Sequence, residues 1–186
     1  MYPGTLFSTK PTKKQMIKAL PFITLEAIKL SALFSKKREQ ALAQAVEWAE
    51  KNWGYLENFN EKYQDDIQKH ADQFYIVYYD AVIAGMFCLY TDMYPQDPDA
   101  LKLDYLYVEP NLRGFGVGSK IVKLVKQKAQ EDFQARVVNL ETFHLSLNKF
   151  YCAQGANILC DETHHAHYSN DTAVHAPSSI LQFPFA

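Results

Sequence analysis

The sequence has no long hydrophobic run, no internal repeat and no low-complexity tract. Its most apolar early segment, residues 19–33, is interrupted by Pro21, Glu26 and Lys29. A bilayer-spanning helix needs about 20 predominantly apolar residues and a signal peptide needs an unbroken apolar core, so this segment fits neither. We therefore expect no membrane partner and a cytoplasmic location.

Cysteine is scarce as well. Cys88, Cys152 and Cys160 are odd in number, widely spaced and set in apolar or aromatic surroundings. Small disulfide-stabilised domains use paired cysteines at short spacings, so these three are predicted to be reduced, mostly buried thiols.

Length and composition indicate one globular domain. With 186 residues, of which 48% are hydrophobic and 22% charged, the chain can bury one sizeable core and is short for two. Residues 1–20 contain Pro3, Gly4 and Pro11, which predicts an irregular lead-in before a single domain at residues 21–186.

Charge is distributed unevenly along the chain, although the net charge is only −2. Residues 1–40 hold eight Lys/Arg against two Asp/Glu, a net +6, whereas residues 41–110 hold four against thirteen, a net −9. An acidic surface attracts cationic partners, so we expect either solvated helix faces or steering of a cation. The basic start lacks the interleaved aromatics that stack on bases, so a nucleic acid partner is not expected.

Hydrophobic periodicity and turn residues predict a mixed α/β (α+β) fold. We expect a strand at 22–30, for which a helix is the alternative, and an antiparallel hairpin from 74–79 and 82–91. Strand, loop, helix and strand follow one another from 103 to 143, which predicts a parallel crossover. The result is a mixed, mostly antiparallel central sheet with helices on both faces. The remaining predicted elements are helices at 35–53, 61–70, 119–136 and 146–154 and strands at 156–160 and 180–185.

Four details of these elements are also predicted. Ser35 is a candidate N-cap for the first helix, and Gly54 is a candidate left-handed residue at its end. Asp65 and Asp66 are expected to face outward from the second helix. Residues 161–178 are expected to be polar and irregular.

A cluster of glycines stands out, because three of only seven lie at Gly114, Gly116 and Gly118. They follow a strand that Pro110 stops, and Ser119 opens a segment with helical apolar spacing. Glycine lets a ligand approach the backbone, and the first amides of a helix have no partner within it. An anion such as pyrophosphate is therefore expected at this helix start, with Arg113 as a nearby cation.

The glycine spacing separates three kinds of phosphate site. A P-loop requires Gly-x-x-x-x-Gly-Lys-Ser/Thr, which this stretch does not supply. A dinucleotide fold requires Gly-x-Gly-x-x-Gly directly after a strand; only Glu141, in the place of a ribose-binding acid, supports it. The run Arg113-Gly114-Phe115-Gly116-Val117-Gly118 instead resembles the Gln/Arg-x-x-Gly-x-Gly/Ala signature of the GNAT (GCN5-related) N-acetyltransferases.

A second segment carries the same resemblance. Lys149-Phe150-Tyr151-Cys152-Ala153-Gln154-Gly155-Ala156 is similar to the family's helix with Phe-Tyr, followed by glycine and an apolar strand, and the two signatures cover about residues 101–160. The family often carries Asn and Ala seven and four residues before the tyrosine, whereas this chain has His144 and Leu147.

The resemblance implies an acetyl-CoA-dependent N-acetyltransferase acting on an amine. The acidic residues 41–110 favour a small cationic amine as the acceptor, and a protein amine is the alternative. It implies that the cofactor lies along a track made by residues of the strand, the loop and the helix start. Its candidate cofactor-binding residues are Leu106, Tyr107, Val108, Arg113, Gly114, Phe115, Gly116, Val117, Gly118 and Ser119.

Two side chains are candidates for the proton chemistry of such a reaction. Asp104, in the approach strand, would bind the ammonium or accept its proton, and Tyr151 would donate a proton to the CoA thiolate. A non-catalytic acyl-CoA-binding or protein-interaction module is the alternative function. The homodimeric state is left open.

A metal ion is not expected. His164, His165 and His167 are candidate metal ligands, but no Cys or carboxylate residues accompany them at the spacing of a metal site. We therefore interpret the segment as a polar loop.

Overall fold

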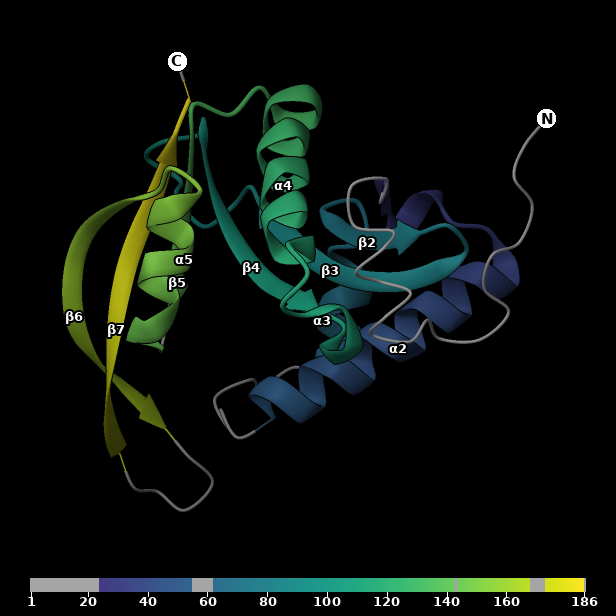
Figure 1. Cartoon of the computed structure of the whole chain (residues 1–186), viewed down its shortest axis with the longest axis horizontal. Helices are drawn as coiled ribbons and strands as arrows, with labels where there is room; N and C mark the ends of the chain where they lie inside the picture. The colour runs from purple at the N-terminus through teal and green to yellow at the C-terminus, as the bar shows by residue number, and fades with distance from the viewer. Residues whose placement is uncertain (1–23, 55–61, 143, 168–172, 186) are drawn as a thin grey trace.

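The computed structural model describes residues 24–54, 62–142, 144–167 and 173–185, with the backbone alone at 145, 160–167 and 173–177. One seven-stranded sheet with the order β1-β2-β3-β4-β5-β7-β6 forms its centre (Figure 1). All neighbouring strands are antiparallel except β4 and β5, so the predicted mixed, mostly antiparallel sheet and the parallel crossover are confirmed. The strands are β1 Leu25–Lys29, β2 Phe74–Tyr79, β3 Val82–Tyr90, β4 Ala100–Val108, β5 Val137–Thr142, β6 Asn157–His167 and β7 Ala173–Pro184.

Helices cover both faces of the sheet. On one face α4 packs its apolar side, including Ile121, Val125 and Ala129, against alternate residues of β2, β3 and β4. On the other face, α2 and α3 enclose a second core with Trp48 and Ile67. The helices are α2 Ser35–Trp53, α3 Tyr63–Lys69, α4 Val117–Phe133 and α5 Asn148–Ala153, with short 3-10 turns at Leu30–Ala32, Pro110–Leu112 and Leu145–Leu147.

Strand β4 changes face midway along its length. Leu101 and Leu103 lie in the core beneath α4, but Tyr105 and Tyr107 lie in the core beneath α2 and α3. Residues two apart normally share one face of a sheet, so an irregularity must intervene. It is a β-bulge, because the register with β3 shifts there and Tyr105 has a φ of +52°.

Strands β4 and β5 separate at the same place. Their pairing ends at Leu103 and Leu140, after which β4 continues against β3 and β5 continues against β7 (Figure 1). The β5 side of β4 is therefore open along residues 104–108, at the carboxyl end of both strands. This opening positions the candidate site.

Two local expectations were wrong, one at each end of α2. Ser35 is the first residue of the helix, at a φ of +40°, and makes no side-chain cap hydrogen bond. Gly54 ends the helix in the right-handed conformation with a φ of −62°, and a Cβ there would lie 2.3 Å from the carbonyl oxygen of Glu50. Gly54 is therefore needed for close backbone approach rather than for a left-handed turn.

Two predictions about polar segments were also wrong. Asp65 is exposed as expected, but Asp66 faces inward from α3 and is only 6% exposed, because tyrosines from β3 and β4 donate hydrogen bonds to it. Residues 161–178 are largely β-sheet, since β6 and β7 pair from Asn157 with Gln182 to His167 with Ala173. Backbone pairing in a hairpin does not require apolar side chains, so a polar composition did not exclude strands.

The cysteines differ in environment. Cys88 is buried in β3, and burial raises its thiol pKa well above the ordinary value, whereas Cys152 on α5 is exposed, contrary to expectation.

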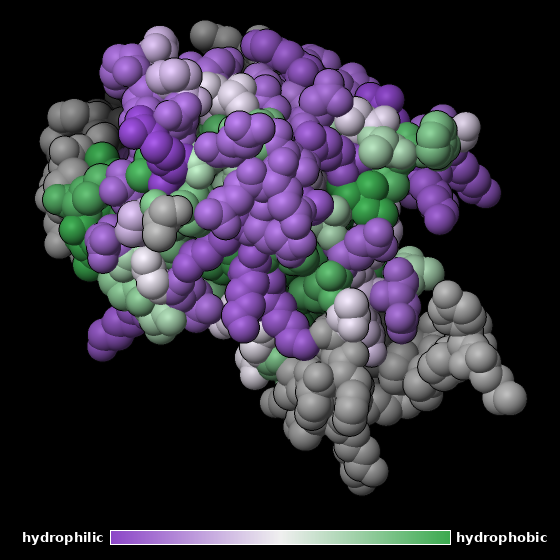
Figure 2. All heavy atoms as spheres, turned by 90° about the horizontal axis from the view of Figure 1, so that it is seen from above, coloured by the Kyte–Doolittle hydropathy of each residue, from purple (hydrophilic) through white to green (hydrophobic). Residues whose placement is uncertain are grey.

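Hydrophilic side chains cover much of the face seen in Figure 2, with hydrophobic groups in patches between them. Among the described helices, none has the length and apolar character of a membrane span. Residues 1–20, whose irregular structure was predicted, lie outside the described part of the chain.

Candidate active site

A cleft of about 900 Å³ opens where β4 and β5 separate. Its walls are β4 from Lys102 to Val108, the glycine loop with the start of α4, the end of β5, α5, and the C-terminal end of α2. The two sequence segments singled out above, 113–118 and 149–156, therefore meet at one cavity.

The glycine loop forms one end of the cleft. Gly114 and Gly116 have φ values of +80° and +74°, a conformation that side chains rarely adopt, and Gly116 is the N-terminal cap of α4. A Cβ at either position would meet nothing within 4 Å, so these two glycines serve backbone conformation and not packing. The first intrahelical bond is donated by Lys120 to Gly116, which leaves the amides of residues 117–119 for an anion.

Arg113 has a defined place beside this loop. Its Nε donates to the carbonyl oxygen of Val108 at 2.9 Å, and its guanidinium lies 4.9 Å from the ring centre of Tyr107. The side chain thus joins the loop to the end of β4 while remaining exposed at the cleft.

The ten predicted cofactor residues divide into two groups. Phe115 and Val117 have buried side chains in the core under α4, so only their backbone groups can serve a ligand. The others line the cleft, namely Leu106, Tyr107, Val108, Arg113, Gly114, Gly116, Gly118 and Ser119.

Asp104 stands near the other end of the cleft, on the face that leads to α2 and α3. Its Oδ1 accepts the backbone N–H of Tyr105 at 2.8 Å, and its Oδ2 lies 3.2 Å from Nζ of Lys102. Burial lowers the pKa of the Lys102 ammonium, but its ion pair and hydrogen bond with Asp104 and the nearby Glu141 outweigh burial and raise it. Two carboxylates and one ammonium therefore gather at this end, and sequence reasoning missed Lys102.

Tyr151 reaches the cleft from α5 and is 7% exposed. Its ring packs on Phe150 and Phe183, with centroid distances of 5.1 and 6.3 Å. Within the described residues its hydroxyl has no hydrogen-bond partner. Burial, followed by the negative charge of Asp104, raises the pKa of Tyr151 to about 12. The phenol is therefore a neutral donor that faces the same space as Asp104.

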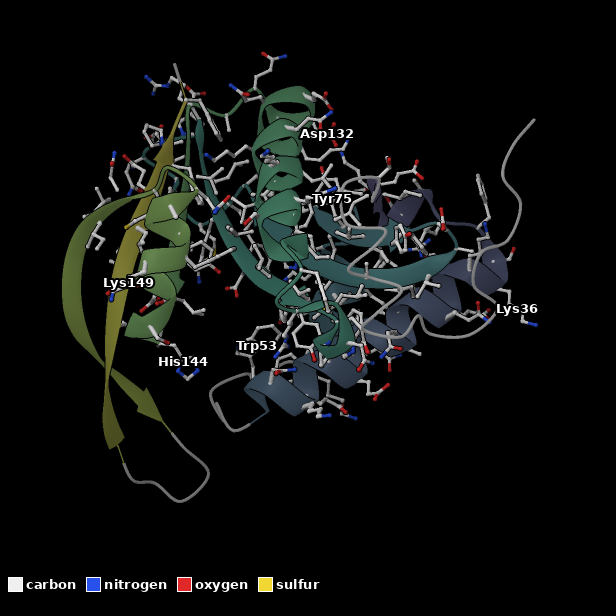
Figure 3. The ribbon with its side chains drawn as sticks, viewed as in Figure 1. Lys36, Trp53, Tyr75, Asp132, His144 and Lys149 are labelled. Atoms are coloured by element: carbon white, nitrogen blue, oxygen red, sulfur yellow. The ribbon has the colours of Figure 1, made fainter. Side chains whose placement is uncertain are left out.

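An aromatic wall, formed by Trp53, Tyr63 and Tyr105, lines the cleft beside Asp104 and was not recognised from the sequence as part of the site. Trp53, at the end of α2, packs edge-on against Tyr105 at 5.5 Å, and Tyr63 of α3 donates from its hydroxyl to the Trp53 carbonyl oxygen at 2.6 Å. His144 lines the cleft from the other side, beside α5 (Figure 3). A signal in the sequence is that Trp53 directly precedes a segment, residues 54–60, whose Tyr55, Glu57 and Phe59 are of the types that line clefts.

A comparison with protein families decides what this arrangement is. A family model described as Acetyltransferase (GNAT) family matches residues 40–155, which include the glycine loop, Asp104 and Tyr151. The chain belongs to the GNAT family of acetyltransferases. The resemblance inferred from the two short signatures is thereby confirmed.

Solved structures support the same fold at low sequence identity. A Bacillus subtilis acetyltransferase in complex with CoA is 14% identical, with a TM-score of 0.59 over 88% of this chain and 99% of that chain. The Salmonella typhimurium protein yncA with its cofactor acetyl-CoA is 9% identical, with a TM-score of 0.64 over 88% and 94%. N-acetylglutamate synthase from Neisseria gonorrhoeae, complexed with CoA and N-acetylglutamate, is 14% identical, with a TM-score of 0.59 over 88% and 35%. No curated protein sequence matches the chain.

The GNAT signatures differ here at His144 and Leu147, both of which line the cleft. The His144 carbonyl oxygen accepts from the Leu147 amide and from the Thr142 hydroxyl, at 2.8 and 3.2 Å. This turn holds the entry to α5 and so supports Tyr151.

In the described part of the chain, no three His, Cys, Asp or Glu side chains are grouped so as to hold a metal ion. The side chains of His164, His165 and His167 lie outside it, although their backbone belongs to β6 rather than to the predicted loop.

Proposed function

We propose that this GNAT protein transfers the acetyl group of acetyl-CoA to an amine, with a small cationic amine as the preferred acceptor. The observation that carries the proposal is the single cleft in which a helix-start anion site, an open strand edge, Asp104 and Tyr151 follow one another. The anionic nucleotide and the reacting carbonyl of the substrate would thereby be held at fixed positions relative to each other.

The residues present fit acetyl-CoA as a substrate. The amides of residues 117–119 and the positive end of α4 suit its pyrophosphate. The side of β4 that β5 leaves open suits a pantetheine arm, since an amide-bearing chain can add to an exposed strand edge. Gly114 and Gly116 leave space at the helix start because no side chain projects there.

The reaction forms one bond and breaks another. The amine nitrogen bonds to the acetyl carbonyl carbon, the carbon–sulfur bond breaks, its electron pair leaves on sulfur, and one amine proton is finally carried by that sulfur. A backbone N–H of β4 would stabilise the developing charge on the carbonyl oxygen, a contribution of about 3–4 kcal/mol in other enzymes. The Tyr151 hydroxyl would donate to the sulfur. The proposal thus makes the part of the cleft around Asp104 and Tyr151 its reacting end.

The contacts of Asp104 favour ammonium binding over proton abstraction as its main role. Both of its oxygens already accept a donor, from Tyr105 N–H and from Lys102, and a second ammonium can share the remaining lone pairs. With Glu141 nearby, the local charge is negative even after Lys102 is counted. The preference for a cation follows from this balance.

The binding half of the proposal is tested by thermal unfolding with and without acetyl-CoA. A ligand that binds only the folded state at about 100 times its Kd adds about 2.7 kcal/mol of stability, so a clear rise in Tm is expected. No rise at saturating CoA would refute the proposal.

The catalytic half is tested by thiol release over a panel of amines that includes neutral, cationic and anionic examples. A stabilised protein that releases no CoA with any amine would instead be an acyl-CoA-binding module. Asp104→Asn is expected to raise the KM for cationic amines more than it lowers kcat. Raising the ionic strength should also raise that KM, because salt screens exposed charges. A KM that ignores both changes would refute the cationic preference. A protein amine as acceptor, the cytoplasmic location and the homodimer stay predictions.

A further inference from the structure

The bulge in β4 places Tyr105 in a conformation that needs support. A φ of +52° is uncommon for a bulky residue, and it occurs here in the middle of a buried strand. The backbone end of Tyr105 is held by Asp104, whose Oδ1 accepts its N–H at 2.8 Å. Something must also hold the side-chain end.

That support comes from Asp66 on α3. Asp66 Oδ2 accepts the hydroxyl of Tyr105 at 2.9 Å and the hydroxyl of Tyr90 at 2.7 Å. Its Oδ1 lies 3.1 Å from Nδ1 of His70. Burial and the Asp66 charge raise the pKa of Tyr105 above its ordinary value, so its hydroxyl remains the donor. This buried aspartate has no contact with the cleft and no role in the chemistry proposed above.

We infer that Asp66 is a positioning residue, which holds the β4 bulge through the Tyr105 hydroxyl and thereby fixes Asp104 and the adjoining strand amides. The inference rests on the proposed function, because it gives that strand the task of holding the thioester. The Tyr105 ring packs against Trp53 and Phe74, with ring-centroid distances of 5.5 Å in both cases. These contacts restrain the ring, but they do not prevent the backbone of the bulge from rotating about it. The hydrogen bond supplies the missing restraint.

A matched pair of variants separates this role from ordinary stability. Tyr105→Phe and Tyr90→Phe each remove one hydroxyl that donates to the same Asp66 oxygen, and the two tyrosines are 4% and 7% exposed. Their losses of stability should therefore be similar. Only Tyr105 adjoins Asp104, so only its variant should alter the reacting end.

The first readout needs no ligand. Amide hydrogen exchange of Tyr105 is expected to accelerate about tenfold in Tyr105→Phe, after correction for global stability, and less than about twofold in Tyr90→Phe. Equal exchange in the two variants would overturn the inference, whatever the protein binds.

The second readout reports on the reacting end. Carbonyl-¹³C-labelled acetyl-CoA bound to the wild-type protein should show its C=O stretch at lower frequency than when free, and Tyr105→Phe should lose much of that shift while Tyr90→Phe keeps it. The kcat should fall about 10- to 100-fold in Tyr105→Phe alone, because displacements near 1 Å have such effects, with an unchanged KM for acetyl-CoA. If wild-type protein shows no bound signal, the proposed function fails, and amide exchange still decides the inference. Equal losses in both variants would show that Asp66 is merely structural.

Discussion

Replacing Tyr151 with phenylalanine tests the chemical half of the site. The change removes only the hydroxyl, and the ring keeps its packing on Phe150 and Phe183. The question is how much of the rate depends on that hydroxyl. Two mechanisms predict different magnitudes.

Complete proton transfer from Tyr151 to the leaving sulfur is costly. The pKa of Tyr151 is raised to about 12, and a thiol has an ordinary value near 8.5. At about 1.36 kcal/mol per unit, that transfer is uphill by about 5 kcal/mol. A hydrogen bond to the thiolate avoids this cost and contributes about 1.5–3 kcal/mol, as do other hydrogen bonds to charged groups. The structure therefore favours donation without full transfer.

We expect kcat to fall by about 10- to 150-fold in Tyr151→Phe, which is the rate equivalent of about 1.5–3 kcal/mol. Removal of a full general acid would cost up to about 10⁴-fold. The KM for acetyl-CoA should not change, because the proposed nucleotide site is at the start of α4. The ratio of wild-type to variant rates should also stay constant from about pH 6 to about pH 10, since the raised pKa keeps the phenol protonated.

The measurement is initial-rate thiol release with the best amine of the panel. Tyr75→Phe is the control: its hydroxyl donates to Asp132 at 2.6 Å, beside α4 and away from the cleft (Figure 3). It should lower stability and leave kcat within about twofold, whereas Tyr151→Phe should leave stability nearly unchanged. A Tyr151→Phe variant with wild-type kcat, or with only a raised KM, would refute a role at the leaving sulfur.

Three further predictions concern two glycines and Tyr75. Gly116→Ala should weaken CoA binding by calorimetry, because its methyl group would enter the cleft at a φ of +74°; unchanged affinity would contradict the anion site. Gly85→Ala should lower the free energy of unfolding in urea by about 2–3 kcal/mol, because its Cβ would lie 2.4 Å from the Tyr107 carbonyl oxygen. Burial raises the pKa of Tyr75 above its ordinary value near 10, so the protonated phenol contributes fully to stability below that pH and its contribution is lost as the pH rises above it. Between about pH 10 and pH 11, the free energy of unfolding of Tyr75→Phe should therefore fall by about 1 kcal/mol less than that of the wild type. Equal falls in the two proteins would contradict the raised pKa.

The glycine turn at the start of α4 could be predicted because its signals are local. Glycines at fixed offsets, a strand before them and a helix after them depend on neighbours in sequence, and the φ values of Gly114 and Gly116 agree with that reasoning. The helix begins at Val117 rather than at Ser119, with Gly116 as its cap. Lys126, on the same helix, donates to the Gln154 carbonyl oxygen, a long-range contact that joins α4 to the end of α5.

The reacting end could not be predicted, because it depends on a bulge and on distant partners. Leu101, Leu103, Tyr105 and Tyr107 alternate perfectly in sequence and indicate one buried face, yet the bulge sends the two pairs to opposite faces. Asp66 stands beside Asp65 on a short polar helix, and only partners 24 and 39 residues away explain its burial. A period-two pattern contains neither kind of information.

The bulge and the opening of the sheet act together in making the site. Up to Leu103, β4 is paired on both sides; beyond it the strand loses β5, and two residues later it has changed face. The loss of β5 exposes the strand edge, while the change of face puts Tyr105 and Tyr107 on the side of α2 and α3, which Asp104 already faces as the neighbour of Leu103. The glycine loop packs with the core under α4, and Tyr105 and Tyr107 pack with the core under α2 and α3. A substitution on α2 or α3 can therefore alter the reacting end without touching the proposed anion site. Variants of Trp53 or Tyr63 in the aromatic wall should change kcat and amine KM while acetyl-CoA affinity stays constant.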